Sequence, residues 1–379
     1  MGLSRIFRFA LASLLSWFVV CCPAWGLVSL DEGRDQLFVN SALTIGYDSN
    51  LFANAVGGGD MSYSLNVGAD YIRRAGWIGL NASVAVNATR YGKFTGEDFQ
   101  DPTFSAEFTK QTGRTTGSLT LSAARENRAD LAANLRDVSW FYQADLNFKY
   151  PVIERYSITG NLGYSYRDFA DNTFLVDLKS YSAGVDLFYV YTTDRDLLAG
   201  YHFREEDTSL DNKSFEHSFT AGMTGKIFSR LNGSLRAGYM FLVPQGTDNQ
   251  GSYSSWTANG SVSWSFTKRF SLTGQVSKDF STTSTNADVD SLSAGLRAQY
   301  AYSSKTSFAT GMGWTDSRYL GLAGGGRHDD SWSWDASLQH TFNGHLSLNL
   351  TYMYFQNWST LAYSDFVRNN VSLSLSSRF

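Results

Sequence analysis

Apolar and polar residues alternate along most of the chain. Between Ser62 and Asp70, every second residue from Tyr63 to Ala69 is apolar, and the residues between them are Ser, Asn, Gly or Asp. The same alternation recurs in residues 78–91. A period of two predicts β-strands that have one apolar and one polar face.

Eighteen segments share this pattern and are expected to be strands. They are 37–47, 62–72, 78–91, 103–110, 116–125, 139–150, 156–167, 180–191, 197–206, 216–227, 233–242, 254–266, 269–279, 290–302, 306–315, 331–342, 345–356 and 367–379. A strand needs about 9–11 residues to cross a bilayer at a tilt, whereas strands of soluble proteins usually have about 5–6. The lengths favour membrane-spanning strands.

Short and long connectors alternate between these segments. The short ones are 74–76, 151–155, 192–196, 267–268, 303–305 and 343–344. The long ones are 48–61, 92–102, 126–138, 168–179, 243–253, 280–289, 316–330 and 357–366. Short periplasmic turns and longer extracellular loops are typical of outer-membrane barrels. The sequence therefore predicts an all-β fold, a transmembrane antiparallel up-and-down β-barrel of about 18 strands (16–18), with both chain termini in the periplasm.

Aromatic residues gather near the ends of the predicted strands. Trp140 and Tyr181 open returning strands at one level, while Phe148 and Phe342 lie at the opposite level. Two aromatic levels separated by smaller apolar residues are typical of the interfacial girdles of a membrane barrel. The alternative, a soluble β-sandwich, would not explain why the aromatic residues lie at the strand ends.

The N-terminus has the features of a secretory signal peptide. Arg5 and Arg8 precede an apolar run over residues 9–20, and the small residues Ala24 and Gly26 follow it. This pattern predicts cleavage after Gly26. The expected units are 1–26, a signal peptide; 27–36, a periplasmic N-terminal segment that is either a tail or folded into the barrel; and 37–379, a single outer-membrane barrel domain.

Composition narrows the class further. Charged residues make up 17% of the chain and aromatic residues 15%, with only 4 prolines, so a disordered chain is excluded. The formal net charge of -4 makes an electrostatic nucleic-acid binder untenable. Both cysteines, Cys21 and Cys22, lie in the signal segment. Val20 before Cys21 does not fit a lipoprotein signal, and without disulfides an exported chain needs another source of stability, such as barrel closure.

The first strand and the last hairpin carry a family resemblance. The chain reads LTIGYDSNLF at 43–52, YMYFQNW at 352–358 and NNVSLSLS at 369–376. These segments resemble the β-barrel porin 2 family of bacterial outer-membrane proteins, which implies an association with exopolysaccharide export. Members often have an arginine in the penultimate strand, where this chain has Phe355 and Gln356. The terminal Phe379 resembles the signal that the barrel assembly machinery recognises.

The polar parity of the strands predicts the residues that line the barrel interior. The candidates are Asp70, Glu107, Asp145, Lys149, Arg167, Asp186, Arg204, Glu206, Lys226, Arg236, Arg297 and Asp335. Acidic and basic members nearly balance, so they either pair across neighbouring strands or line a weakly selective pore. Asp145, Lys149, Arg167 and Asp186, on three consecutive strands, are expected to form a cross-strand network.

Three aromatic residues also fall on the inward parity. Phe141, Phe188 and Phe355 could stack on sugar rings or could simply fill space. No connector suggests a plug domain or a long loop that narrows the pore. This absence favours a monomer over the trimers of general porins.

The sequence shows no motif of an enzyme active site or of a metal site. His202 lies between polar wall residues, but no motif places a nucleophile beside a base. His340 and His345 flank a turn and lack a carboxylate or cysteine partner for a metal. We therefore expect no catalytic residue, no metal and no cofactor.

Three functions follow from these observations. The family resemblance implies exopolysaccharide export across the outer membrane. The alternatives are passive diffusion of small hydrophilic solutes, and a structural sheath for a periplasmic or electron-carrying partner. The expected partners are outer-membrane lipid, the barrel assembly machinery and, for export, polysaccharide and periplasmic export proteins.

Overall fold

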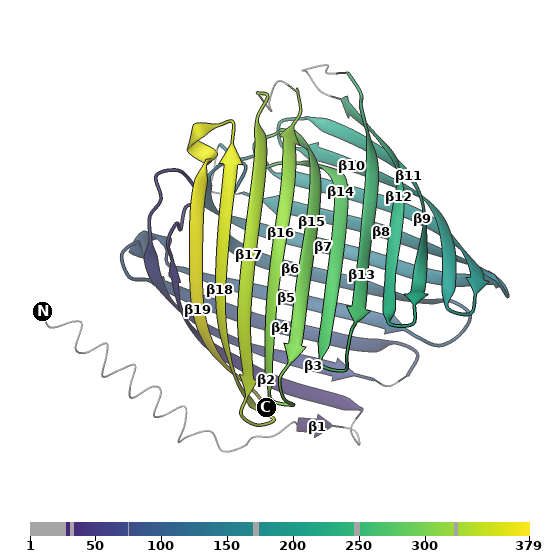
Figure 1. Cartoon of the computed structure of the whole chain (residues 1–379), viewed down its shortest axis with the longest axis horizontal. Coiled ribbons are helices and arrows are strands. Elements are labelled where there is room, and N and C mark those ends of the chain that lie inside the picture. Colours follow the sequence, from purple (N-terminus) through teal and green to yellow (C-terminus); the bar gives the residue numbers. More distant parts are fainter. Residues whose placement is uncertain (1–27, 31–33, 75, 170–173, 246–250, 322–324) are drawn as a thin grey trace, which may run out of the picture.

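The computed structural model describes residues 28–30, 34–74, 76–169, 174–245, 251–321 and 325–379. The predicted signal peptide, residues 1–26, lies outside the described residues. The described chain is almost entirely antiparallel strand (Figure 1).

Eighteen long strands form the wall of a closed barrel. They are β2 (Asp35–Asp48), β3 (Asp60–Arg73), β4 (Gly79–Tyr91), β5 (Phe99–Lys110), β6 (Thr116–Asp130), β7 (Leu135–Ile153), β8 (Tyr156–Asp168), β9 (Leu178–Thr192), β10 (Arg195–Thr208), β11 (Lys213–Phe228), β12 (Leu231–Gln245), β13 (Tyr253–Ser265), β14 (Phe270–Thr282), β15 (Asp288–Ala301), β16 (Thr306–Tyr319), β17 (His328–Thr341), β18 (Leu346–Ser359) and β19 (Phe366–Arg378). Each pairs with its neighbours in sequence, so the predicted up-and-down topology is confirmed.

The barrel closes between the first and last long strands. β19 pairs with β2 from Asn370 opposite Asp48 to Arg378 opposite Asn40. A short strand, β1 (Val28–Leu30), pairs with the start of β2, with Val28 opposite Leu37. The segment predicted as a tail or an inward fold thus contributes a strand at the end where the C-terminus also lies (Figure 1). Closure leaves no exposed edge along the paired length of β2 and β19.

The two faces of the wall differ in chemistry. Leu350 is 43% exposed, and its partners on the neighbouring strands are Leu338 and Leu373. The next residue, Thr351, lies opposite Ser337 and Ser372. The polar face is the interior, because its side chains meet across the barrel; Arg204 on β10, for instance, contacts Asp279 on β14 at 3.1 Å. An exposed apolar exterior around a polar interior is the arrangement of a barrel embedded in lipid.

Aromatic side chains on the exterior occupy two levels. Near one end, Tyr164 packs against Tyr181, with ring centroids 5.1 Å apart. Near the other, Tyr156 packs against Tyr189 at 5.0 Å. The same strand pair, β8 and β9, carries both contacts, so the levels are separated along the strands.

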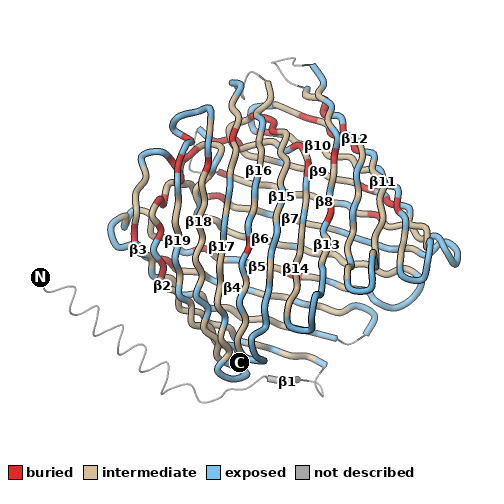
Figure 2. Tube along the Cα trace, viewed as in Figure 1, coloured by how far each residue is buried: buried red, intermediate tan, exposed pale blue. Residues whose placement is uncertain are grey.

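The two ends of the barrel are built differently. At the end that holds β1 and the C-terminus, the turn end, pairs such as β9 and β10 are joined by two residues, 193–194. At the opposite end, the loop end, connectors reach residues 49–59 between β2 and β3. Buried residues gather mostly toward the loop end (Figure 2), where Leu51, Ala53 and Ser364 are at most 2% exposed. The tightest packing of the molecule is therefore at the loop end.

Two 3-10 turns occur among the connectors of the described chain, η2 (Thr95–Glu97) and η3 (Ala362–Ser364). Within the described residues, no helix has the length and apolar character to span a membrane.

Candidate functional site

The β6–β7 hairpin leaves the wall at the loop end and lies across the opening. β5 pairs with β6 only as far as Thr103 opposite Ala124, whereas β6 and β7 stay paired up to Asp130 opposite Leu135. Beyond Ala124 the hairpin no longer pairs with the β5 backbone ladder and contacts β5 through side chains, as where the Asn127 backbone N–H donates to the Asp101 carboxylate at 3.0 Å. Its tip, residues 131–134, contacts loops that start from the far side of the barrel. We call this tip the crossing turn.

A second hairpin, β14–β15, comes from nearly the opposite wall. β13 pairs with β14 only up to Ala258 opposite Lys278, so this hairpin too is released from one neighbour. The two hairpins meet where the Ser284 hydroxyl donates a 2.6 Å hydrogen bond to the Asp130 carboxylate. The other Asp130 oxygen accepts bonds from the backbone N–H groups of Ala132 and Ala133, at 2.8 and 3.0 Å. One carboxylate thus shapes the crossing turn and joins it to β14–β15.

Asn134 fixes the end of the crossing turn. Its side-chain amide donates to the Ala53 carbonyl at 3.0 Å, and its carbonyl oxygen accepts from the Ser364 hydroxyl. Its φ of 54° lies in the left-handed region, which asparagine tolerates better than most residues. The turn is consequently held by loops from both sides of the β2–β19 closure.

A cavity of about 410 Å³ lies beside this crossing, and we refer to it below as the passage. It is lined by Arg128, Ala129, Asp130, Leu131, Ala132, Asp137, Ser139, Arg167, Phe169, Leu178, Ser281, Thr282, Thr283, Ser284, Val289, Ser291, Ser317 and Tyr319. These residues come from both hairpins and from β8, β9 and β16, so the volume extends between facing walls. Its lining is mainly hydroxyl and charged groups with a few apolar side chains.

The connector lengths predicted that no long loop narrows the barrel. That prediction missed the β6–β7 hairpin. The connector expected over residues 126–138 is only residues 131–134, because the strands continue to Asp130 and start again at Leu135. The narrowing element is a continued strand pair, so loop length did not reveal it. Among the signals in the sequence, only Asn134 and the acidic Asp130 marked the tight turn.

Below the crossing, Arg167 is held by two groups on neighbouring strands. It donates to Glu126 at 2.7 Å and to Ser139 at 2.8 Å. Its guanidinium lies over the Phe141 ring, 4.6 Å from the centroid. Glu126 also lies 3.4 Å from Arg128. The cations on this side of the passage therefore share one carboxylate.

Arg204 forms the most connected ion cluster of the interior. It contacts Glu216 on β11, Glu206 at 3.5 Å on its own strand, and Asp279 on β14 at 3.1 Å. It also donates to the Phe280 carbonyl. These contacts bridge the place where β14 has left β13, so the guanidinium ties the β14–β15 hairpin to the opposite side of that gap.

A third cluster lies deeper, on β9, β10 and β12. Asp186 accepts from His202 at 3.1 Å and from Arg236 at 3.4 Å. Gly200 leaves room for the Asp186 carboxylate, since a Cβ at this position would lie 1.9 Å from it. His202 is thus held by a carboxylate and a guanidinium.

The network predicted among Asp145, Lys149, Arg167 and Asp186 is wrong. Arg167 pairs with Glu126, and Asp186 pairs with His202 and Arg236. Among the described side chains, Asp145 and Lys149 form no ion pair. The register explains this, because Lys149 and Asp186 lie opposite Thr159 on its two sides. The two are therefore two strand spacings apart, about 10 Å.

The remaining charged candidates also belong to the interior parity of their strands, and each lies close to a polar or charged side chain. Arg297 contacts Asp335 at 3.1 Å. Asp70 accepts from Asn40 at 2.5 Å and lies 3.6 Å from Arg378. The two others also have neighbours, Glu107 with Asn81 at 3.3 Å and Lys226 with Asp194 at 3.7 Å.

The three aromatic candidates differ in their surroundings. Phe141 lies beneath Arg167, and Phe355 packs against the buried Phe366 with centroids 5.6 Å apart. Phe188 lies opposite the buried Leu198. Phe355 therefore serves packing at the loop end.

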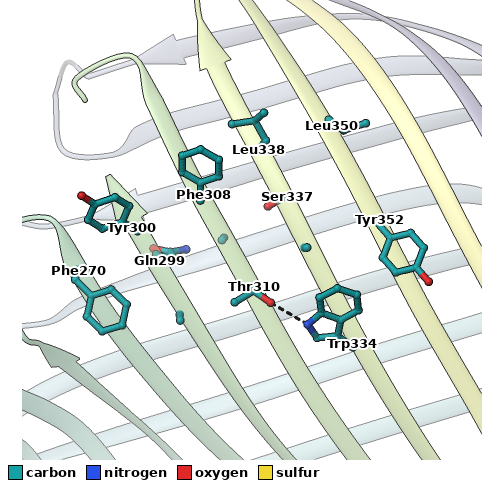
Figure 3. A pocket seen from close by; sticks show the side chains of 13 residues that line it. Phe270, Gln299, Tyr300, Phe308, Thr310, Trp334, Ser337, Leu338, Leu350 and Tyr352 are labelled. Atoms are coloured by element: carbon teal, nitrogen blue, oxygen red, sulfur yellow. Dashed lines mark hydrogen bonds between the residues drawn. The ribbon is translucent and has the colours of Figure 1, made fainter. Parts of the chain in front are cut away.

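An apolar hollow of about 550 Å³ lies on the exterior of β14–β18 (Figure 3). Phe308, Leu338 and Leu350 line it, and Trp334 donates to the Thr310 hydroxyl at 3.0 Å on its rim. Most of its residues, among them Phe308, Leu338 and Leu350, belong to the exposed apolar parity. The hollow is therefore part of the outer surface and separate from the interior passage.

One set of side chains could bind a metal ion. Asp316, His328 and Asp330 offer ligand atoms within 4.8 Å of one another on the exterior face, and no motif in the sequence indicated them. Asp316 is already engaged by His328 at 2.8 Å and by Arg318 at 3.3 Å. At the turn end, His340 contacts the Thr306 hydroxyl at 2.9 Å.

Residues 192–359 match the family model of Gram-negative porins. This is a different porin family from the one that the first strand and last hairpin resemble. No curated protein matches the chain in sequence.

The fold is shared with solved structures at low sequence identity. OpdK of Pseudomonas aeruginosa, solved with vanillate, is 12% identical with a TM-score of 0.51, covering 90% of this chain and 99% of that chain. OccK2 (OpdF) of Pseudomonas aeruginosa, solved with glucuronate, is 12% identical with a TM-score of 0.53, covering 91% and 98%. OccAB3 of Acinetobacter baumannii is 10% identical with a TM-score of 0.52, covering 91% and 99%. At this identity the likeness establishes a shared barrel architecture.

Proposed function

We propose that the chain is an outer-membrane porin through which small hydrophilic solutes diffuse. The observation that carries the proposal is the narrowed loop end: two hairpins joined by Asp130 and Ser284 leave a polar passage of about 410 Å³. A volume of this size accommodates a small organic solute. The match of residues 192–359 to Gram-negative porins supports the same assignment.

The membrane assignment rests on the exterior. Leu350, Leu373 and Val371 are each more than 40% exposed in the middle of the wall. Such a surface is unfavourable in water but suits the hydrocarbon region of a bilayer. In this orientation the turn end faces the periplasm and the loop end faces outward. Lipid is then the partner of the exterior, and the assembly machinery the partner of Phe379.

The alternatives fit the interior less well. A polysaccharide chain would have to thread past the joined hairpins, and a sheath would have to admit a protein to the same space. Two of the solved barrels with this fold carry vanillate and glucuronate, which are small solutes. We therefore place passive diffusion before export, and the charged interior candidates become the lining of the pore.

The test is transport by the purified barrel. Refolded protein in planar bilayers should produce discrete current steps in KCl, and proteoliposomes should swell faster in monosaccharides than in oligosaccharides. Vanillate and glucuronate should enter as well. Absence of conductance, or equal swelling in all sugars, would contradict the proposal. Loss of surface polysaccharide on gene deletion, restored by complementation, would instead support export.

A further inference from the structure

Arg327 reaches the crossing turn from the β16–β17 connector. Its Nη1 donates to the Ala132 carbonyl at 2.5 Å and its Nη2 to the Leu131 carbonyl at 2.9 Å. Only 9% of its side chain is exposed. Ala132 and Leu131 lie 195 and 196 positions before Arg327 in the sequence. The contact therefore joins segments that start from different walls of the barrel.

The guanidinium is itself fixed in place. Its Nε donates to both Asp329 carboxylate oxygens at 3.0 Å, and its Nη2 lies 2.6 Å from one of them. It stacks on the Tyr319 ring, 4.4 Å from the centroid. Asp329 in turn accepts from the Ser359 hydroxyl on the neighbouring strand. The planar fork of arginine therefore divides its donors between a rigid wall and the crossing turn.

The other anchors of the turn make fewer charge-assisted bonds. Asn134 makes neutral amide and hydroxyl contacts, and Ser284 makes a single charge-assisted bond, to the Asp130 carboxylate. Arg327 contributes charge-assisted bonds to two successive carbonyls in a buried position. Such bonds are about twice as strong as neutral ones, and the cation would be left without acceptors on one side if the turn moved away.

We propose that Arg327 is the positioning residue that holds the crossing turn over the pore, and so sets the largest solute that passes. This inference rests on the proposed function as a diffusion channel. Arg327 acts through the turn, because the turn and the β14–β15 hairpin, rather than the guanidinium, border the passage. Removing its carbonyl contacts should let the turn move and widen the opening.

The chain offers a matched control on the same hairpin. Arg318 pairs with Asp316 two residues away at 3.3 Å, just as Arg327 pairs with Asp329 two residues away. The Arg318 side chain is 69% exposed on the exterior and does not contact the crossing turn. Arg318→Ala thus removes the same charge and the same kind of ion pair without touching the pore.

The experiment measures polymer exclusion in planar bilayers. Polyethylene glycols of increasing size are added to wild type, Arg327→Ala, Arg327→Lys and Arg318→Ala, and the smallest polymer that fails to lower the conductance is determined. Arg327→Ala should conduct more than wild type and exclude only larger polymers. Arg327→Lys should fall between them, since an ammonium cannot serve both carbonyls and Asp329 in the same geometry. Arg318→Ala should match wild type.

The outcomes separate the two proposals. A wild-type barrel that does not conduct overturns the proposed function itself. A wild type that conducts, together with a folded Arg327→Ala that keeps the same exclusion limit, overturns only the role of Arg327. If Arg327→Ala does not fold, Arg327→Lys decides, and an exclusion limit equal to wild type would count against the inference.

Discussion

The Ser284 hydroxyl donates a 2.6 Å hydrogen bond to the Asp130 carboxylate and thereby joins two hairpins that start from nearly opposite walls of the barrel. Ser284 is 4% exposed, so water competes little for the bond. A hydrogen bond to a charged group contributes about 1.5–3 kcal/mol to stability. That energy is small against the whole barrel but large for the position of a turn.

Ser284→Ala should therefore loosen the meeting of the hairpins without unfolding the wall. We expect larger current fluctuations and a higher mean conductance in single-channel recordings. Ser271→Ala, on β14 of the same hairpin but at the turn end, is the control and should leave the recordings unchanged. Identical traces for wild type and Ser284→Ala would show that the bond does not restrain the opening.

The orientation of the wall gives a second prediction from adjacent residues. Leu350 lies on the exposed apolar exterior and Thr351 faces the interior. An arginine on the lipid face near the bilayer centre costs about 2–4 kcal/mol, whereas an interior position is hydrated. Leu350→Arg should therefore lower the free energy of unfolding by that amount, and Thr351→Arg by much less. Denaturant unfolding from lipid vesicles, followed by tryptophan fluorescence, measures both; equal losses would contradict the orientation.

The alternation of residues was enough to predict the wall, because lipid on one side and water on the other impose a period of two along every strand. All eighteen predicted segments overlap the long strands, from β2 (Asp35–Asp48) to β19 (Phe366–Arg378). The shortest of the predicted segments, 103–110, lies within β5 (Phe99–Lys110).

The ion pairs and the crossing turn could not be predicted in the same way. Alternation assigns Arg167 and Asp186 to a face, but their partners depend on the stagger between strands, which the pattern along one strand does not contain. Arg327 meets Leu131 only after the barrel has closed and two hairpins have left the wall. Its sequence neighbourhood resembles any charged loop.

Charge balance near the passage gives a third prediction. Arg167→Gln leaves Glu126 without its 2.7 Å partner and removes one positive charge from the interior. A unit charge about 10 Å from the ion path contributes about 0.4 kcal/mol in water. The change favours cations and disfavours anions by that amount each, so the ratio of cation to anion permeability should rise about fourfold. Reversal potentials under a KCl gradient measure the ratio.

The matched control for this change is Arg318→Gln, on the exterior. It alters the net charge equally but is separated from the ion path by the wall, so its reversal potential should equal that of wild type. A shift of Arg167→Gln toward anions, or the same shift in both variants, would contradict the assignment of Arg167 to the pore.

Phe379 gives the fourth prediction, because two roles can be separated there. Its backbone exchanges hydrogen bonds of 3.0 and 2.8 Å with Val39 at the closure of the barrel, and its ring stacks on His345 with centroids 5.2 Å apart. Phe379→Ala keeps the backbone bonds, so the purified chain should still refold in detergent. If the ring is the signal that the assembly machinery recognises, the same variant should accumulate poorly in the outer membrane of cells.

His345→Ala removes the stacking partner but keeps the terminal ring, and it should assemble in cells like wild type. The fraction of heat-modifiable barrel on gels, compared between membranes and refolded protein, measures both steps. Equal losses for the two variants would mean that the ring acts by closing the barrel and not as a recognition signal.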